Sequence, residues 1–183
     1  MLYPALAARP GLPWVVFSAV PRPACIDLPH GIWLCPDERD WQGDLHCALP
    51  LPFASESIGA LAIQHVDSRR SQDWLAECAR VLVPGGRLSV LALNPLSPYR
   101  THWQGQGPQG REPFVWRRRL KRAALLPDPL AQGLGAHWRP RIEHRLRLGA
   151  GARAAYLLSA EKRQMPLTPK RVRVLGPALG QGA

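Results

Sequence analysis

The chain has 183 residues, of which 46% are hydrophobic and 20% are charged, as is ordinary for one soluble globular domain. No stretch approaches the roughly 20 apolar residues that cross a bilayer, so no membrane-spanning helix is expected. The 4 cysteines contain no CxxC pair, which argues against a zinc site and predicts reduced thiols in the cytoplasm.

The formal net charge of +11 is concentrated in one part of the sequence. Residues 111–173 hold 16 Lys or Arg against 4 acidic residues, whereas the rest of the chain is close to neutral. Such an asymmetry indicates an acidic partner, either a nucleic acid or another anionic surface. The same pattern is also that of a solvated, arginine-rich face with no specific ligand.

The N-terminal part consists of short apolar runs separated by prolines. Residues 14–20 (WVVFSAV) form a β-branched run that predicts a strand, and residues 24–28 and 31–35 are two further runs. Proline removes a backbone donor and clashes with the preceding helical turn, so a long helix is excluded here. Because two parallel strands need a crossover of about a dozen residues or more, the region has space for one short crossover.

A strand–helix–strand unit follows. Ile58–Gln64 (IGALAIQ) is a nearly continuous apolar run, as expected for a strand that is covered on both faces. The next helix is predicted to begin after an N-cap at Ser71 and to end at Pro84-Gly85-Gly86. Its apolar residues form one helical stripe: Trp74, Leu75, Cys78, Val81 and Leu82. Residues 87–93 (RLSVLAL) form the second strand, so the unit predicts a parallel pair with a right-handed crossover.

The C-terminal part predicts a basic helix and an antiparallel hairpin. Residues 114–126 (FVWRRRLKRAALL) form the helix, which is bounded by prolines. Residues 142–148 and 153–160 form the hairpin, with a glycine-rich turn between them. Residues 1–163 are therefore predicted to make one domain, and residues 164–183 a disordered tail.

Three segments of this chain resemble the class I, type 11 S-adenosylmethionine-dependent methyltransferase domain. They are GDLHCALPLPF, which begins at Gly43, LPFASESIGALAIQHV, and ECARVLVPGGRLSVLALNP. The similarity covers about residues 43–170, with its strongest piece at residues 80–95. It implies a shortened Rossmann-like α/β fold with a parallel core, and S-adenosyl-L-methionine as cofactor.

The resemblance also assigns roles to individual residues. Asp44 would accept a hydrogen bond from the adenine amino group, and Leu45 would lie over the adenine ring. Gln64 and His65 would lie at a strand end near the methionine part of the cofactor, in agreement with the rule that open α/β sheets bind ligands beyond the carboxyl ends of their strands. Residues 94–97 would border the substrate.

The glycine-rich cofactor loop of the family is degenerate here, since no GxGxG occurs near the N-terminus. In one alignment, residues 24–31 (ACIDLPHG) correspond to that loop, with Pro29 in place of a glycine. In the other, residues 14–20 are the first strand and residues 32–37 the second. Asp37 or Glu38 would then be the nearest carboxylate to hold the ribose hydroxyls.

Two functions follow from these observations. The first is an S-adenosylmethionine-dependent methyltransferase whose acceptor, a small molecule or a nucleic acid, is unknown. The second is a non-catalytic, methyltransferase-like module that uses its basic half to bind a partner. Methyl transfer depends mainly on proximity, alignment and exclusion of water, so no catalytic triad is expected. His65 is a candidate base, no metal ligand is predicted, and the oligomeric state does not follow from the sequence.

Overall fold

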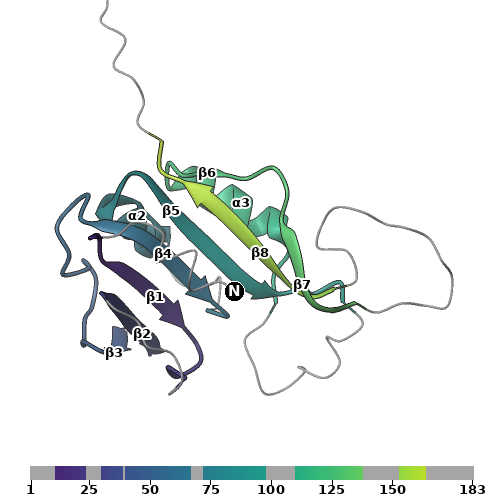
Figure 1. The fold of residues 1–183 in the computed structure, drawn as a ribbon, viewed down its shortest axis with the longest axis horizontal. Coiled ribbons are helices and arrows are strands. Elements are labelled where there is room, and N and C mark those ends of the chain that lie inside the picture. Colours follow the sequence, from purple (N-terminus) through teal and green to yellow (C-terminus); the bar gives the residue numbers. More distant parts are fainter. Residues whose placement is uncertain are drawn as a thin grey trace, which may run out of the picture.

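The computed structural model describes residues 11–23, 30–38, 40–66, 72–97, 110–137 and 153–163. Within these residues a mixed sheet has the strand order β3-β2-β1-β4-β5-β8-β6, and β7 also pairs with β8 (Figure 1). The strands are β1 (Trp14–Ser18), β2 (Gly31–Asp37), β3 (Asp40–Gly43), β4 (Ile58–Gln64), β5 (Leu82–Leu93), β6 (Leu126–Pro127), β7 (Gln132–His137) and β8 (Arg153–Glu161). The helices are α2 (Gln72–Val81) and α3 (Pro113–Arg122).

The centre of the sheet is parallel, as the sequence predicts. Strand β1 pairs in parallel with β2 on one side and with β4 on the other, and β4 pairs in parallel with β5. Both predicted strands of the strand–helix–strand unit therefore lie next to each other in one sheet, joined by α2. The parallel core is confirmed.

Antiparallel strands flank this core. Strand β3 turns back along β2, because only two residues separate them and so short a connection allows a hairpin but no parallel crossover. Strand β8 pairs antiparallel with β5, β6 and β7. The antiparallel C-terminal part agrees with the predicted fold, but its described partner strand is β7. The strand predicted at residues 142–148 lies outside the described residues.

Both described helices pack on the same face of the sheet. Residues of α2 and α3 share one buried cluster with alternate residues of the strands. Helix α2 contributes four residues of the predicted stripe, all at most 1% exposed: Trp74, Leu75, Cys78 and Val81. The helix ends at Val81, before the predicted stop at Pro84-Gly85-Gly86, and the fifth residue of the stripe, Leu82, begins β5. Helix α3 contributes Trp116 and Leu120. It ends at Arg122 instead of Leu126, because Ala124 has a left-handed backbone with φ of 58°.

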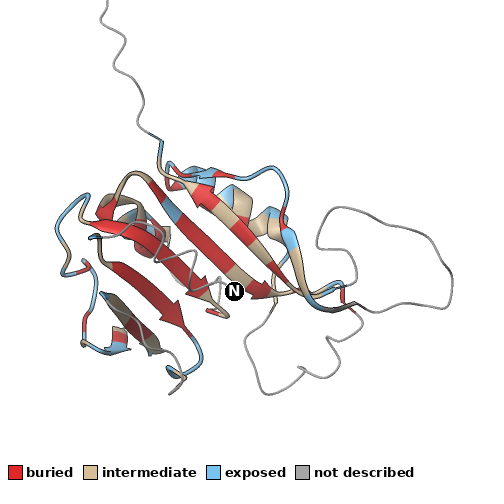
Figure 2. Ribbon diagram, viewed as in Figure 1, coloured by how far each residue is buried: buried red, intermediate tan, exposed pale blue. Residues whose placement is uncertain are grey.

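The opposite face of the sheet carries a second, smaller cluster. Its buried members are Trp14, Val16, Trp33, Ala60 and Ala62. These residues alternate along β1, β2 and β4 with those that face the helices, which explains why the strands read as continuous apolar runs (Figure 2).

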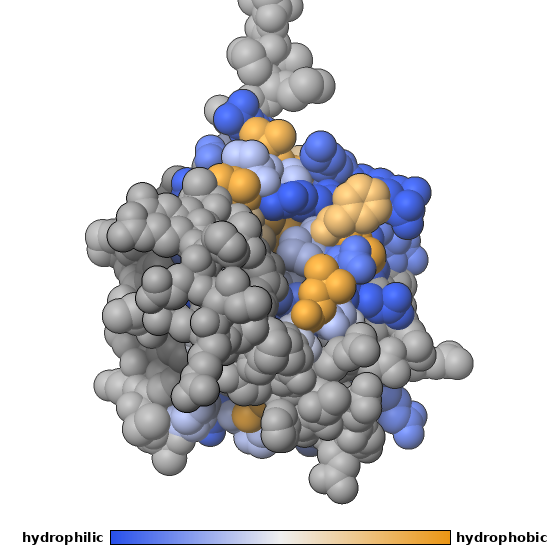
Figure 3. Space-filling view, turned by 90° about the vertical axis from the view of Figure 1, so that its right-hand side faces the viewer, coloured by the Kyte–Doolittle hydropathy of each residue, from blue (hydrophilic) through white to orange (hydrophobic). Residues whose placement is uncertain are grey.

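Large apolar side chains remain exposed on the side of the molecule that carries α3. Phe114 is 64% exposed and Leu130 is 54% exposed. Figure 3 shows apolar residues set among strongly hydrophilic ones on this side. Among the described helices, none has the length and apolar character to cross a membrane. Residues 164–183, the predicted tail, lie outside the described residues.

Candidate functional site at the carboxyl edge of the parallel strands

The sheet has one topological switch point, at the carboxyl end of β1. From β1 the chain continues to β2 on one side, and it returns on the other side of β1 as β4. In open α/β sheets this geometry separates the connections that follow the two strands, which leaves a place for a ligand beyond the strand ends. The polar groups at this edge are therefore the candidates for a binding site.

Ser18 and Gln64 lie side by side where β1 and β4 end. They are register partners, and the Ala19 N–H donates to the Gln64 carbonyl at 3.0 Å. Ser18 is fully buried, and its Oγ accepts a hydrogen bond from the Val20 N–H at 3.0 Å. Ser18 is not among the predicted site residues, although it follows the apolar run WVVF in the same way that Gln64 follows IGALAI.

His65 has a strained backbone and an unsatisfied ring nitrogen. Its φ is 54°, a left-handed conformation that is uncommon for a residue other than glycine. The backbone N–H donates to the Leu91 carbonyl at 2.9 Å, which fixes the residue just beyond β4. The Nδ1 atom is buried and has no hydrogen-bond partner within the described part of the chain. Burial lowers the pKa of His65, so the imidazole is neutral at pH 7 and Nδ1 can accept a proton or a hydrogen bond.

This pKa shift predicts how stability depends on pH. The unfolded chain binds a proton on His65 at about pH 6.5, whereas the folded chain resists it, so the free energy of unfolding should fall as the pH drops below that value. In His65→Asn, which tolerates the left-handed backbone and carries no titrating ring, this loss should be smaller by up to about 1.4 kcal/mol per pH unit. Urea unfolding between pH 5 and 8 measures it. His30→Asn, at an exposed histidine that also has a left-handed backbone, is the matched control and should follow the wild-type profile.

The end of β5 has a structural role that uses its polar groups. The Asn94 side chain, 1% exposed, donates from Nδ2 to the Arg153 carbonyl at 3.0 Å and accepts the Leu96 N–H at 3.1 Å. The Ser97 N–H donates to the Asn94 carbonyl at 3.0 Å. These bonds tie the end of β5 to the start of β8. Leu96, 68% exposed, is the residue of this turn that is open to solvent.

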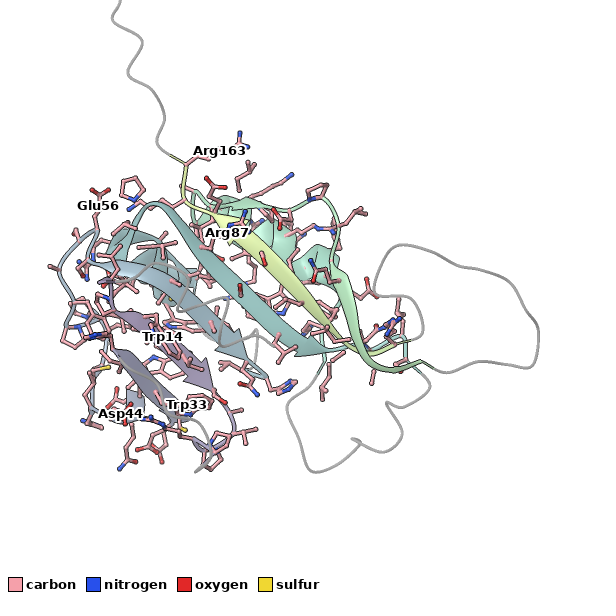
Figure 4. All side chains as sticks on the ribbon, in the orientation of Figure 1. Trp14, Trp33, Asp44, Glu56, Arg87 and Arg163 are labelled. Carbon is pink, nitrogen blue, oxygen red and sulfur yellow. The ribbon has the colours of Figure 1, made fainter. Side chains whose placement is uncertain are left out.

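Asp44 and Leu45 follow β3, and two strands, β2 and β1, lie between β3 and the strand that ends at Gln64. Asp44 follows β3, but because β3 is antiparallel it lies beside Trp33, toward the amino end of β2 (Figure 4). Its Oδ2 accepts the Trp33 N–H at 2.7 Å and lies 3.7 Å from Arg22, while the Asp44 N–H donates to the Trp33 carbonyl. The side chain of Leu45 packs against the buried cluster under the helices.

Gly43 allows this close approach of β3 to β2. A Cβ atom at Gly43 would lie 2.1 Å from the Trp33 carbonyl oxygen, closer than any side chain permits. The hairpin instead places two other carboxylates at the carboxyl end of β2. Asp37 and Glu38 are both exposed there, in agreement with the alignment that makes β1 the first strand and β2 the second. The other alignment places the cofactor loop at residues of which 24–29 lie outside the described part.

No family model matches this sequence, and no curated protein sequence matches it. Solved structures do. YcgJ from Bacillus subtilis superposes with a TM-score of 0.53 at 10% identity, over 90% of this chain and 97% of that protein. A SAM-dependent methyltransferase from Archaeoglobus fulgidus gives 0.51 at 12% identity, over 83% and 87% of the two chains.

The chain has the fold of a class I S-adenosylmethionine-dependent methyltransferase. A further neighbour is the geranyl diphosphate C-methyltransferase of Streptomyces coelicolor, solved with S-adenosyl-L-homocysteine, with a TM-score of 0.51 and 14% identity over 88% and 76% of the chains. Identities this low show a shared fold and leave the activity to be argued from the site.

The polar groups at the edge fit a cofactor of this kind in part. The exposed carboxylates of Asp37 and Glu38 can accept hydrogen bonds from the ribose hydroxyls of such a cofactor. The buried, unsatisfied Nδ1 of His65 can accept a hydrogen bond from a donor group of the cofactor. The turn after β1 fits less well, since the N–H groups of Ala19 and Val20 are already bonded and Pro21 has none. Within the described residues, no group of three or more His, Cys, Asp or Glu is placed to hold a metal ion.

Proposed function

We propose that this protein is an S-adenosylmethionine-dependent methyltransferase that binds its cofactor beyond the carboxyl ends of β2, β1 and β4. The observation that carries the proposal is the polar edge at the switch point of a parallel sheet, with Gln64 and Ser18 in register and His65 next to them. The likeness in fold to solved methyltransferases supports the same conclusion.

Each group at the edge has a role in this proposal. Gln64 and His65 would contact the methionine part of the cofactor, and Asp37 and Glu38 the ribose. When bound, the cofactor supplies a methyl group on a positively charged sulfur. The protein positions the acceptor and excludes water, which accelerates a reaction that depends on alignment. The neutral His65 imidazole can take the proton that the acceptor loses, at Nδ1.

Isothermal titration calorimetry with S-adenosyl-L-homocysteine tests the cofactor site. The wild-type protein should bind with a Kd in the micromolar range. Gln64→Ala should bind about tenfold more weakly, because one lost hydrogen bond of about 1.4 kcal/mol corresponds to that factor. Arg87→Ala, at an exposed residue midway along β5, is the control and should bind like wild type. A flat trace with folded protein would contradict the proposal.

Asp44→Ala tests the role that the family resemblance gives to Asp44. If the adenine lies at the outer edge of β2, beside Asp44, this substitution should abolish binding. Asp37→Ala should weaken binding, because it removes a contact to the ribose. Unchanged affinity in Asp44→Ala would remove Asp44 from the site. The same titration then leaves the ends of β2, β1 and β4 as the place of the cofactor.

A further inference from the structure

Helix α3 has an outer face that combines an aromatic ring with cations. Phe114, Arg118, Lys121 and Arg122 are all exposed, and their spacing of i, i+4, i+7 and i+8 places them on one side of the helix. We call these four residues the outer face of α3. The opposite side, Trp116 and Leu120, is buried against the sheet.

The three cations of this face differ from other basic residues in their lack of a partner within the described part of the chain. Arg118, Lys121 and Arg122 form no ion pair with any described residue, whereas Arg80, Lys162 and other cations do. Over residues 110–137 and 153–163, nine Lys or Arg stand against Glu112, Asp128 and Glu161. The helix dipole favours cations in the last turn, which accounts for Lys121 and Arg122 but not for the exposed ring of Phe114.

We propose that the outer face of α3 binds single-stranded nucleic acid. A helix rises about 1.5 Å per residue, so Phe114, Arg118 and Arg122 follow one another at intervals of about 6 Å along its surface. Cations in such a row can contact successive phosphates, and an exposed aromatic ring can stack on a base. Stacking requires an unpaired base, which favours a single strand over a duplex.

The chemistry of this face argues against a lipid surface as the occupant. A helix that lies in a membrane interface turns its apolar side toward the lipid. The apolar side of α3 is buried in the protein, and its exposed side has one aromatic ring among three cations. The chemistry of this face is therefore complementary to a polyanion and not to a lipid surface.

The position of α3 brings such a strand near the candidate site. Helix α3 begins close to the carboxyl end of β5, where a Cβ on Gly110 would lie 2.6 Å from the Leu93 carbonyl oxygen. The Tyr156 hydroxyl donates to the Arg111 carbonyl and fixes this start. Phe114 is therefore at the end of the outer face that is nearer to the carboxyl edge, and Arg122 at the far end. Binding itself does not depend on the cofactor.

Fluorescence anisotropy with a labelled oligouridine tests the cations. Arg118→Ala/Arg122→Ala should bind at least tenfold more weakly than wild type at low salt. Because each phosphate contact to a single strand contributes about 0.7 to the slope of log affinity against log salt, the slope should decrease by about 1.4. The control is Arg22→Ala/Arg87→Ala, which removes the same number of cations at exposed residues away from α3, one of them paired with Asp44, and should change affinity less than twofold.

Phe114 tests the stacking contact. Phe114→Ala should weaken binding about tenfold, whereas Phe114→Tyr, which keeps the ring, should bind like wild type. Circular dichroism checks that all variants are folded. Equal losses in the two arginine double variants would overturn the proposal, as would binding to vesicles with phosphatidylserine in the absence of binding to oligouridine. A duplex bound as tightly as the single strand, with no effect of Phe114→Ala, would also overturn it.

Discussion

Trp41→Ala is expected to lower the free energy of unfolding by about 3–5 kcal/mol. This is a large part of the total free energy of unfolding of a typical domain, which is about 5–15 kcal/mol. Trp41 is 1% exposed, and its ring centroid lies 4.5 Å from that of Phe17 and 5.0 Å from that of Trp74. The three rings join β3, β1 and α2. Removing one indole leaves a cavity that these separate elements cannot close without moving.

Trp41 connects the β2–β3 hairpin to the core of the protein. The region between β1 and β3 has too few proline-free residues for the usual helices of an open α/β sheet, and the β2–β3 hairpin inserts the Trp41 side chain into the core beside α2. Urea unfolding followed by circular dichroism measures the loss. Gln42→Ala, at the exposed neighbour on β3, should change stability by less than about 0.5 kcal/mol. A wild-type midpoint for Trp41→Ala would show that the hairpin does not support the core.

The sequence was sufficient to predict the parallel core. The run at Ile58–Gln64 has no polar interruption, and the stripe of Trp74, Leu75, Cys78 and Val81 has helical spacing. Both patterns result from burial: a strand covered on two faces must be apolar throughout, and a helix on one face of the sheet must be apolar on one side. Where burial is this complete, periodicity identifies the element.

The outer strands were harder to predict because they are less buried, and their sequences therefore lack a clear apolar pattern. Strand β7 contains Gly133 and Gly135, with φ of 78° at Gly135, and its pairing with β8 shifts register between Leu134 and His137. No alternation of apolar and polar residues marks such a segment. The direction of β3 depends on the two residues that connect it to β2, which a family resemblance centred on later motifs does not reveal.

The residues of the candidate site also differ in how far the sequence predicts their positions. Gln64 and His65 could be placed because they end a strand whose direction was predicted, and the parallel core brings Ser18 next to them. Asp44 and Leu45 could not be placed, since their location depends on whether β3 runs parallel or antiparallel. Residue types alone do not determine that. The backbone strain at His65 and its unsatisfied Nδ1 have no signature in the sequence.

Two of the segments that resemble the methyltransferase family contact each other through Arg80. The Arg80 guanidinium donates to the carbonyl of Leu51 at 3.1 Å and that of Phe53 at 3.0 Å, both in the LPF segment. It also forms two hydrogen bonds of 2.8 Å to Glu77, which in turn accepts the Leu51 N–H at 3.0 Å. The segment before β4 is thus held to α2, and the N–H of Glu56 donates to the Arg80 carbonyl at 3.0 Å.

Arg80→Ala should therefore lower the free energy of unfolding by about 2 kcal/mol, since it removes several charged hydrogen bonds at a partly exposed site. The melting temperature should fall by about 4–8 °C in a chain of this size. Arg80→Lys should recover little of the lost stability, because an ammonium group lacks the planar geometry with which the guanidinium donates to Glu77 and to the two carbonyls. Arg87→Ala, at an exposed arginine on β5, should leave the melting temperature within about 2 °C of wild type.

A pH profile separates this contact from simple loss of packing. The hydrogen bond from Arg80 lowers the pKa of Glu77, so the folded chain keeps this carboxylate charged to a lower pH than the unfolded chain does. The contribution of Glu77 to stability is then present above the usual pKa of a glutamate, about 4.5, and is lost as the pH falls through the lowered value. Between pH 6 and 3 the wild type should lose more stability than Arg80→Ala does. Parallel profiles would mean that Arg80 does not hold the LPF segment through Glu77.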